Sequence, residues 1–253
     1  MARTSDVLRL AAFAEVQGGG NPAGVLIADD QLPDVPTMMA TAAAVGYSET
    51  VFAAPLPSDG GWRVRYFAPE SEVSFCGHAT IALGAALALK LGDGTYALQL
   101  NDSKITVEAS KSGGGKIAAA LQSPPTSSKP ADSQLVARTL ALFGLPASDL
   151  DARIPLTVAD AGSAHLVVLL LDQRTLSAME YELEAGRALM NEYGLTTIAL
   201  LFAESSTRFC ARCAFACVLA TPTQAHVGAW QAHMHWVLPL HMHWVLVVQV
   251  DFP

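Results

Sequence analysis

Charged residues are scarce in this sequence, and no stretch concentrates positive charge. Only 15% of its 253 residues are Asp, Glu, Lys or Arg, and the formal net charge is −8. Proteins that bind nucleic acid or anionic membranes usually do so through clusters of Lys and Arg, and the sequence has no such cluster. We therefore expect neither nucleic acid nor a membrane among its partners.

Membrane-spanning segments and nucleotide-binding loops are missing as well. The apolar stretch that begins after Thr80 is broken by Lys90, so it is too short to cross a bilayer. Three consecutive glycines at 18–20 lack the spacing of a dinucleotide-binding or phosphate-binding loop. They form either a flexible hairpin between two strands or a loop whose backbone approaches a ligand closely.

Cysteine is rare and occurs without a secretory context. Residues 1–6 lead directly into a strand-like stretch and show no signal-peptide pattern. The four cysteines are Cys76, Cys210, Cys213 and Cys217. We expect reduced thiols in a cytoplasmic protein, and not a disulfide framework.

Hydrophobic residues, in contrast, make up 51% of the chain, which favours a well-packed globular protein over disorder. Their pattern predicts helices at 36–45, 133–143 and 182–193, each followed directly by a glycine that can end it. No residue from Ala79 to Leu89 is charged, so we expect this stretch to be a helix that is buried on all sides.

A turn with a thiol, a glycine and an imidazole precedes the buried helix. Its residues are Cys76, Gly77 and His78. The first turn of a helix presents unpaired N–H groups and the positive end of the helix dipole, so it is a natural place for an anionic group. The same dipole favours the neutral form of an imidazole and lowers the pKa of a thiol.

A carboxylate, Glu49, stands where a strand is expected to begin, between Tyr47 and Val51. A carboxyl group that enters an apolar region is drawn toward its protonated form, which suits a general acid and base. The alternative interpretation is a solvated glutamate at the end of a strand. Position alone favours the solvated glutamate.

A Pro- and Ser-rich stretch at 123–130 divides the chain. Such a composition is typical of a linker between folded parts. We therefore predict a first half-domain at 1–122, a linker at 123–132 and a second half-domain at 133–253.

The two halves share landmarks at one fixed offset. Gly46 recurs as Gly194, and Phe67 with the alanine after it recurs as Phe215 with its alanine. The offset is 148 residues in both cases, the difference between 46 and 194 and between 67 and 215. This repeat predicts a duplicated fold with a site between the two halves.

Four motifs together resemble the phenazine-biosynthesis PhzF-like family, from about Val7 to Arg212. They are Gly20-Asn21-Pro22-Ala23, Ser48-Glu49-Thr50-Val51-Phe52, Arg63-Val64-Arg65-Tyr66-Phe67-Ala68-Pro69 and Phe75-Cys76-Gly77-His78-Ala79-Thr80. The resemblance implies the α+β fold of diaminopimelate epimerase. In that fold two pseudo-repeated halves each wrap a curved, mostly antiparallel sheet around a central apolar helix, and the active site lies between the halves.

The resemblance also implies a function. In PhzF-like isomerases a glutamate of the Ser-Glu-Thr motif moves a proton on a small carboxylate-bearing substrate, without a metal or an organic cofactor. That glutamate corresponds to Glu49, and the histidine near the substrate corresponds to His78. A carboxyl group that both takes and gives a proton suits this chemistry.

Four further residues are expected to bind the substrate. Asn21 lines the pocket by resemblance, and the backbone of Gly77, Ala79 and Thr80 is placed to hold a substrate carboxylate at the helix N-terminus. Relatives of this fold often pair, so a homodimer is expected by analogy, while the residues themselves leave the oligomeric state open.

Cys76 has two interpretations. In diaminopimelate epimerase a cysteine of the matching turn is one of two thiol bases, which would make this protein a thiol-dependent epimerase or racemase. That mechanism needs a second thiol from the other half, and none of the three later cysteines has the Cys-Gly turn. The alternative, which we favour, is a small buried residue.

The second half departs from the family pattern after about Arg212. The family carries an acid there in a motif of the type Asp-Pro-x-Thr-Gly, but the corresponding stretch at 218–230 has no Asp. After Gln173 the only aspartate is Asp251. The explanations are a shift of reading frame in the tail, which we favour, or a divergent tail in an inactive relative that only binds its ligand.

The tail also contains a short repeat with histidines, because the six residues at 233–238 recur at 241–246. Histidines two residues apart lie on one face of a strand and could hold a metal ion. An ordinary strand with alternating side chains is the interpretation we favour. We therefore expect no metal and no cofactor.

Overall fold

The chain forms two compact units. The computed structural model describes residues 6–13, 20–57, 60–112, 117–205, 209–215, 230–232 and 248–250. The units have these bounds: unit 1 is Met1–Pro124, Cys217–His226 and His243–Pro253, and unit 2 is Pro125–Ala216 and Val227–Met242. In the part of the chain that is described, no helix is both long enough and apolar enough to cross a membrane.

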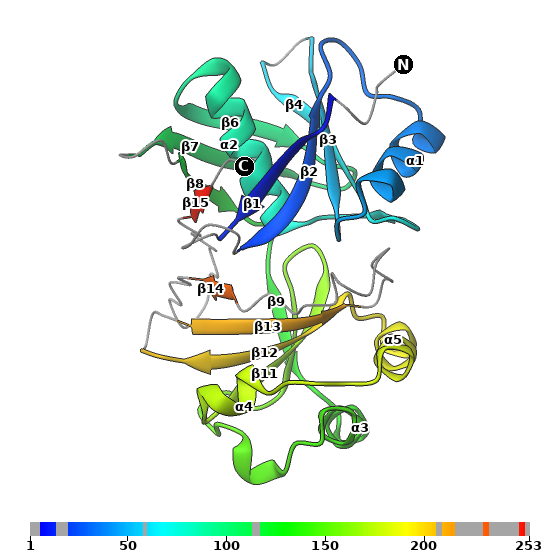
Figure 1. Ribbon diagram of the computed structural model, residues 1–253, viewed down its shortest axis with the longest axis vertical. Coiled ribbons are helices and arrows are strands. Elements are labelled where there is room, and N and C mark those ends of the chain that lie inside the picture. The colour runs from blue at the N-terminus through cyan, green and yellow to red at the C-terminus, as the bar shows by residue number, and fades with distance from the viewer. Residues whose placement is uncertain are drawn as a thin grey trace. The chain divides into compact units, whose positions relative to one another are not determined.

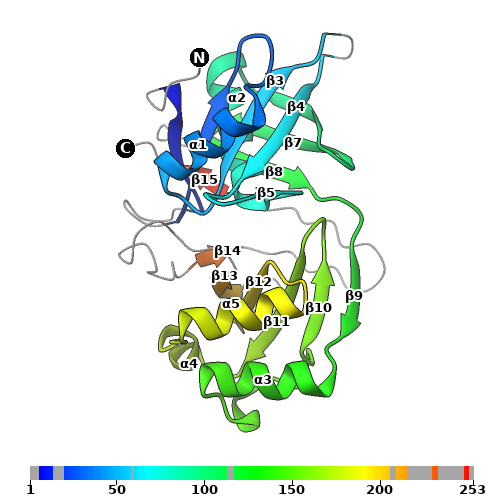
Figure 2. The ribbon, with the colours of Figure 1, turned by 90° about the vertical axis from the view of Figure 1, so that its right-hand side faces the viewer.

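Unit 1 is a curled sheet of nine strands, counted over its described residues. The strand order is β1-β2-β3-β4-β6-β7-β8-β15, and β5 pairs with β4. The bounds are β1 (Leu8–Ala12), β2 (Asn21–Ile27), β3 (Thr50–Pro55), β4 (Trp62–Phe67), β5 (Glu72–Val73), β6 (Gly94–Gln99), β7 (Lys104–Lys111), β8 (Ile117–Gln122) and β15 (Val248–Val250). The sheet wraps around helix α2 (Gly77–Leu91), and β15 contacts β1 as well as its partner β8 (Figures 1 and 2).

Helix α2 is the centre of the core of unit 1. Every residue from His78 to Ala88 is buried, which confirms the helix predicted from the missing charges. The helix contacts β1, β2, β7 and β8. Gly84 allows the closest approach, because a Cβ at this position would lie 2.5 Å from Cγ2 of Val107 in β7.

Helix α1 (Val35–Val45) covers the other face of the same sheet. Asp34 caps its first turn by accepting a backbone hydrogen bond, and Gly46 ends it at a φ of 73°. Because side chains alternate along a strand, Val51 of β3 packs in the core around α2, while Phe52 packs in the core beneath α1. Strand β3 is therefore buried on both faces.

Unit 2 contains a sheet of six strands, counted over its described residues, in the order β14-β13-β12-β11-β10-β9. Their bounds are β9 (Ser127–Pro130), β10 (Thr157–Asp160), β11 (Ala164–Leu170), β12 (Thr197–Ala203), β13 (Phe209–Phe215) and β14 (Trp230–Ala232). The helices are α3 (Ser133–Phe143), α4 (Gln173–Ser177), α5 (Leu183–Glu192) and a 3-10 turn at Ala147–Asp149. Strand β9 lies inside the stretch expected to be a linker, 123–132, and forms one edge of this sheet.

The strand pairing of unit 1 recurs in unit 2. In unit 1, β2 pairs antiparallel with β1 and parallel with β3, and β3 pairs antiparallel with β4. In unit 2, β11 likewise pairs antiparallel with β10 and parallel with β12, and β12 pairs antiparallel with β13. Helices α1 and α5 precede the equivalent strands β3 and β12, and each is followed by a glycine of positive φ, Gly46 or Gly194. The predicted duplication within an α+β fold is confirmed. A central apolar helix in the second half stays a prediction, because the stretch expected to precede or contain it, 218–230, lies outside the described residues except for Trp230.

Candidate active site

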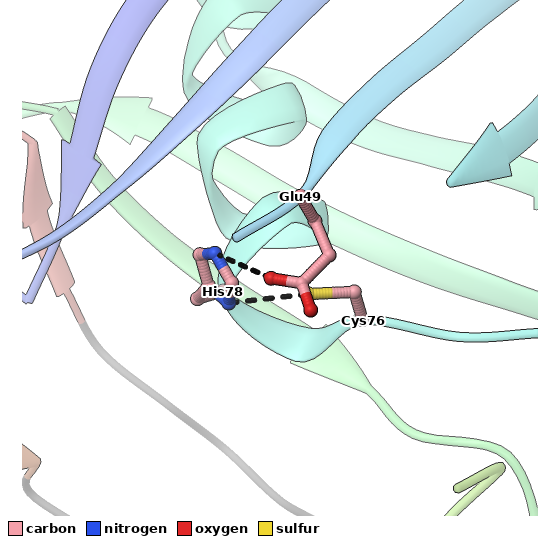
Figure 3. A group of neighbouring side chains, drawn as sticks. All are labelled: Glu49, Cys76 and His78. Atoms are coloured by element: carbon pink, nitrogen blue, oxygen red, sulfur yellow. Dashed lines mark hydrogen bonds and ion pairs between the residues drawn. The ribbon is translucent and has the colours of Figure 1, made fainter. Parts of the chain in front are cut away.

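Three ionisable side chains of unit 1 meet at the N-terminus of α2. Glu49 immediately precedes β3, Cys76 is the N-cap residue of α2, and His78 lies in its first turn (Figure 3). One polar or sulfur atom from each lies within 4.8 Å of the others. Their exposed fractions are 5%, 9% and 8%, so the three groups are almost completely shielded from water.

The imidazole of His78 contacts both other groups through different ring nitrogens. Its Nδ1 lies 3.1 Å from Sγ of Cys76, and its Nε2 lies 3.4 Å from Oε2 of Glu49 (Figure 3). A neutral imidazole with its proton on Nε2 fits both contacts, because Nδ1 then accepts from the thiol and the N–H faces the carboxylate. The Oγ of Ser48, 3.5 Å from Nε2, is a further polar neighbour that was not among the predicted site residues.

Burial dominates the electrostatics of the site. It lowers the pKa of His78, against the opposing effects of the Glu49 carboxylate and of a hydrogen bond with the Pro22 carbonyl. The helix dipole had predicted a neutral imidazole. The lowered pKa of His78 agrees with that prediction in direction, but its main cause is desolvation. Burial and the Glu49 carboxylate raise the pKa of the Cys76 thiol well above its ordinary value.

The expectation that the helix N-terminus lowers the thiol pKa is therefore wrong. The N–H groups of Ala79 and His78 do favour the Cys76 thiolate, but their effect is smaller than that of desolvation. A helix dipole contributes typically ~0.3–1 kcal/mol, whereas removing a charge from water shifts a pKa by up to about 3–5 units. Cys76 is accordingly held as a neutral thiol.

The position of Glu49 is set by the parallel pairing of β2 and β3. The N–H of Gly24 in β2 donates a hydrogen bond to the carbonyl oxygen of Glu49 at 3.2 Å. A Cβ at Gly24 would lie 2.6 Å from Oγ1 of Thr50, so only glycine permits the strands to approach this closely. The two strands therefore hold the backbone of Glu49 beside the start of α2.

A buried chain of hydrogen bonds holds the turn that carries Cys76. The hydroxyl of Thr80 donates to the carbonyl oxygen of Cys76 at 2.7 Å and lies 2.7 Å from the hydroxyl of Tyr66 in β4. Because the Thr80 proton is used by that carbonyl, Tyr66 is the donor to Thr80. The backbone of Cys76 is thus tied to the sheet through the side chains of Thr80 and Tyr66.

The other predicted binding residues differ in what they can offer a ligand. Asn21, the first residue of β2, is 6% exposed, and its Nδ2 has no hydrogen-bond partner. At Gly77 a Cβ would meet only Leu121, at an ordinary contact distance of 3.9 Å. Ala79 and Thr80 are 0% exposed. Both the hydroxyl and the N–H of Thr80 are bonded to the carbonyl of Cys76, which gives Thr80 a structural role, and its contact with a substrate stays a prediction.

The predictions for the tail lie outside the described residues. The stretch 218–230, which lacks the family's second acid, is described only at Trp230. The four histidines of the repeat at 233–238 and 241–246 are likewise not among the described residues. Within unit 2, Thr197 is the counterpart of Thr50, because these residues pair with Phe215 and Phe67. The position that corresponds to Glu49 is therefore Thr196, which is not an acid.

The fold and this cluster define a two-half α+β protein with a buried group of ionisable side chains at the start of the helix α2. The family model described as phenazine biosynthesis-like protein matches residues 10–245. The chain therefore belongs to the PhzC/PhzF family of phenazine biosynthesis-like proteins. The match extends beyond Arg212, the point where the resemblance read from the motifs fades.

Two curated relatives carry isomerase names. An uncharacterized isomerase from Deinococcus radiodurans is 33% identical over 218 residues, which cover 84% of this chain and 68% of the relative. The trans-2,3-dihydro-3-hydroxyanthranilate isomerase of Pseudomonas fluorescens is 29% identical over 182 residues, which cover 71% of this chain and 61% of the relative. The chain thus matches about two thirds of the length of these proteins.

A solved structure supports the fold. The PhzF-family phenazine biosynthesis protein of Bacillus anthracis superposes with a TM-score of 0.67 at 21% sequence identity. The superposition covers 82% of this chain and 70% of that one. At this identity the likeness concerns the fold alone.

Proposed function

We propose that this protein is an isomerase that moves a proton on a small carboxylate-bearing substrate by cofactor-independent acid–base catalysis. The observation that carries the proposal is the buried Glu49 carboxylate, which faces a neutral imidazole and a neutral thiol in a chain of this family. Of the three groups, only Glu49 is suited to take a proton from a carbon acid and return the same proton to another position. No net proton is gained or lost in that sequence.

The neighbouring groups have supporting roles in this proposal. His78 offers a polar contact that stabilises the charge of Glu49 without competing for the proton, because burial keeps its pKa low. The unpartnered Nδ2 of Asn21 is a buried donor that an oxygen of the substrate would satisfy. The N–H of Gly77, at the start of α2, is proposed as a further donor for the substrate carboxylate.

The test uses the substrate named for the Pseudomonas relative, trans-2,3-dihydro-3-hydroxyanthranilate, in deuterated water. Glu49→Gln keeps the shape of the side chain and removes the acid, so we expect isomerisation and deuterium exchange to fall by at least ~100-fold. Glu108→Gln, on the exposed face of β7, is the matched control and retains full activity. Undiminished turnover by Glu49→Gln would remove the assignment.

A thiol-dependent epimerase is the second candidate, because Sγ of Cys76 lies 3.1 Å from an imidazole nitrogen. Cys76→Ser separates the two mechanisms. A glutamate shuttle tolerates the loss of the thiol within about tenfold, while a thiol base does not. Binding of the substrate without any exchange in the unmodified protein would instead indicate a non-catalytic relative.

A further inference from the structure

We propose that Glu49, Cys76 and His78 also form a binding site for a soft divalent cation, Zn²⁺ in particular, which blocks the acid–base site reversibly. Binding of the ion is inferred from the convergence of three different donor atoms and is independent of the proposed isomerase activity, whereas its inhibitory effect rests on the proposed function. A sulfur, a ring nitrogen and a carboxylate oxygen lie within 4.8 Å of one another in one buried cluster (Figure 3). All three come from one unit, and two of them are fixed by the same helical turn.

The donor set selects the class of ion. Thiolate and imidazole ligands favour Zn²⁺ and similar soft ions, while Mg²⁺ and Ca²⁺ require oxygen ligands. In a tetrahedral zinc site, bond lengths of ~2.0–2.3 Å place neighbouring donor atoms roughly 3.3–3.6 Å apart. Only one ring nitrogen of His78 can bind the ion, and Nδ1 lies 3.1 Å from Sγ of Cys76, close to this spacing. The three donor atoms, one from each residue, lie within 4.8 Å of one another. A rotation of the Glu49 side chain would bring its carboxylate oxygen to the bonding distance.

The charges of such a site balance. A hydrated Zn²⁺ ion displaces the proton of the Cys76 thiol to solvent and forms a Zn–S bond, while Glu49 binds as the carboxylate and His78 as the neutral imidazole. The two negative ligands then neutralise the two positive charges of the ion, so that no net charge is buried. Three protein ligands leave a fourth position for water.

Binding of the ion would compete with catalysis. The carboxylate of Glu49 cannot hold the metal and accept a proton from a substrate at the same time. The ion is therefore an inhibitor and not a resident cofactor, and its removal by a chelator restores the acid–base site.

The experiment uses Co²⁺ as a coloured substitute for Zn²⁺ on the full-length protein. A Co²⁺–thiolate bond produces charge-transfer absorption in the near ultraviolet, which reports the ligand directly and needs no substrate. We expect this band to appear with one Co²⁺ per chain, to disappear on addition of Zn²⁺, and to be lost in Cys76→Ser. In His78→Gln and Glu49→Gln the affinity for Co²⁺ falls at least about tenfold.

The controls are Cys213→Ser and Cys217→Ser, which keep the band, and circular dichroism of every variant, which shows that each is folded. Absence of a thiolate band at saturating Co²⁺, or a band that persists in Cys76→Ser, overturns the inference. Because the band is measured without substrate, zinc binding by a protein that fails to isomerise contradicts only the proposed function. Isomerisation by a protein that gives no band contradicts only the metal site.

Discussion

At the scale of single residues, burial decides the chemistry of the candidate site. The N-terminus of α2 offers Cys76 and His78 the same positive dipole, yet the pKa of the thiol rises and the pKa of the imidazole falls. Both shifts favour the neutral form, which is the signature of desolvation and not of a dipole. Glu49 thus faces a neutral imidazole and a neutral thiol.

The hydroxyl of Thr80 gives a residue-scale prediction. Thr80→Val keeps the shape but removes the donor to Cys76 and the acceptor for Tyr66, so we expect a loss of ~1–3 kcal/mol in the free energy of unfolding. Thr80→Ser keeps the oxygen and loses only a methyl group, with an expected loss of about 1 kcal/mol. Urea unfolding measures both. Equal stability of the two variants would contradict the structural role assigned to this hydroxyl.

At the scale of elements, the closeness of α2 to the sheet determines unit 1. The helix is apolar on all sides because strands contact it around its circumference, and its tightest contact is with β7 at Gly84. Small residues are therefore required on this side of the helix. A larger side chain would push α2 away from β7 and displace the residues at its N-terminus.

Gly84→Ala tests this contact. The new Cβ would lie 2.5 Å from Cγ2 of Val107, a fully buried side chain with a stiff rotamer, so we expect a loss of about 1–3 kcal/mol despite the better helix propensity of alanine. Adding Val107→Ala removes the clash. The double variant should therefore lose less free energy of unfolding than the two single variants lose in sum. If the losses measured by urea unfolding simply add, the clash is ruled out.

The ion pair between β4 and β5 predicts a dependence on pH. Two hydrogen bonds from Arg65 to Glu72, at 2.7 and 2.5 Å, lower the pKa of Glu72 below its ordinary value of 4.5. The stability gained from a lowered carboxyl pKa is present above pH 4.5 and is lost as the pH falls through the folded-state pKa. About a quarter of the Glu72 side chain is exposed, so we expect only ~0.5–1 kcal/mol.

Glu72→Gln measures that contribution. The variant should be less stable than the unmodified protein at neutral pH, and the difference should shrink as the pH is lowered below 4.5. Glu108→Gln, which has no such partner among the described contacts, serves as the control. A stability difference that is the same at neutral and acidic pH would show that the ion pair is not its cause.

At the scale of the whole molecule, residues far apart in the sequence complete the sheet of unit 1. Strand β15 pairs with β8, so Val248, Gln249 and Val250 lie opposite Ala119, Ala118 and Ile117. The last strand of the sheet therefore comes from the end of the chain, more than a hundred residues after its partner. We therefore expect the stability of unit 1 to depend on the pairing of β15 with β8.

Removal of residues 248–253 tests this connection. Without β15, the outer edge of β8 loses its hydrogen-bond partner, so we expect faster amide hydrogen exchange at 117–119. Amides of β3, which is paired on both sides, serve as the internal control and keep their protection. Unchanged exchange at 117–119 would show that β15 does not protect β8 in solution.

The sequence alone was sufficient for those features that depend on local pattern. The absence of charge between Ala79 and Leu89 identified the buried helix, and the glycines after 36–45, 133–143 and 182–193 marked three helix ends that the structure confirms. The four motifs identified the family, because they combine residue types that few folds require together. The repeat at an offset of 148 residues indicated the duplication that the strand pairing confirms.

Only the tertiary structure decided how these features interact. It brought Ser48 to the imidazole and committed the Thr80 hydroxyl to the Cys76 carbonyl, neither of which follows from sequence spacing. It also reversed the expected direction of the thiol pKa. The physical reason is the same in each case: a local pattern reports the helix that a residue belongs to, whereas desolvation and hydrogen bonding depend on strands that arrive from elsewhere in the chain.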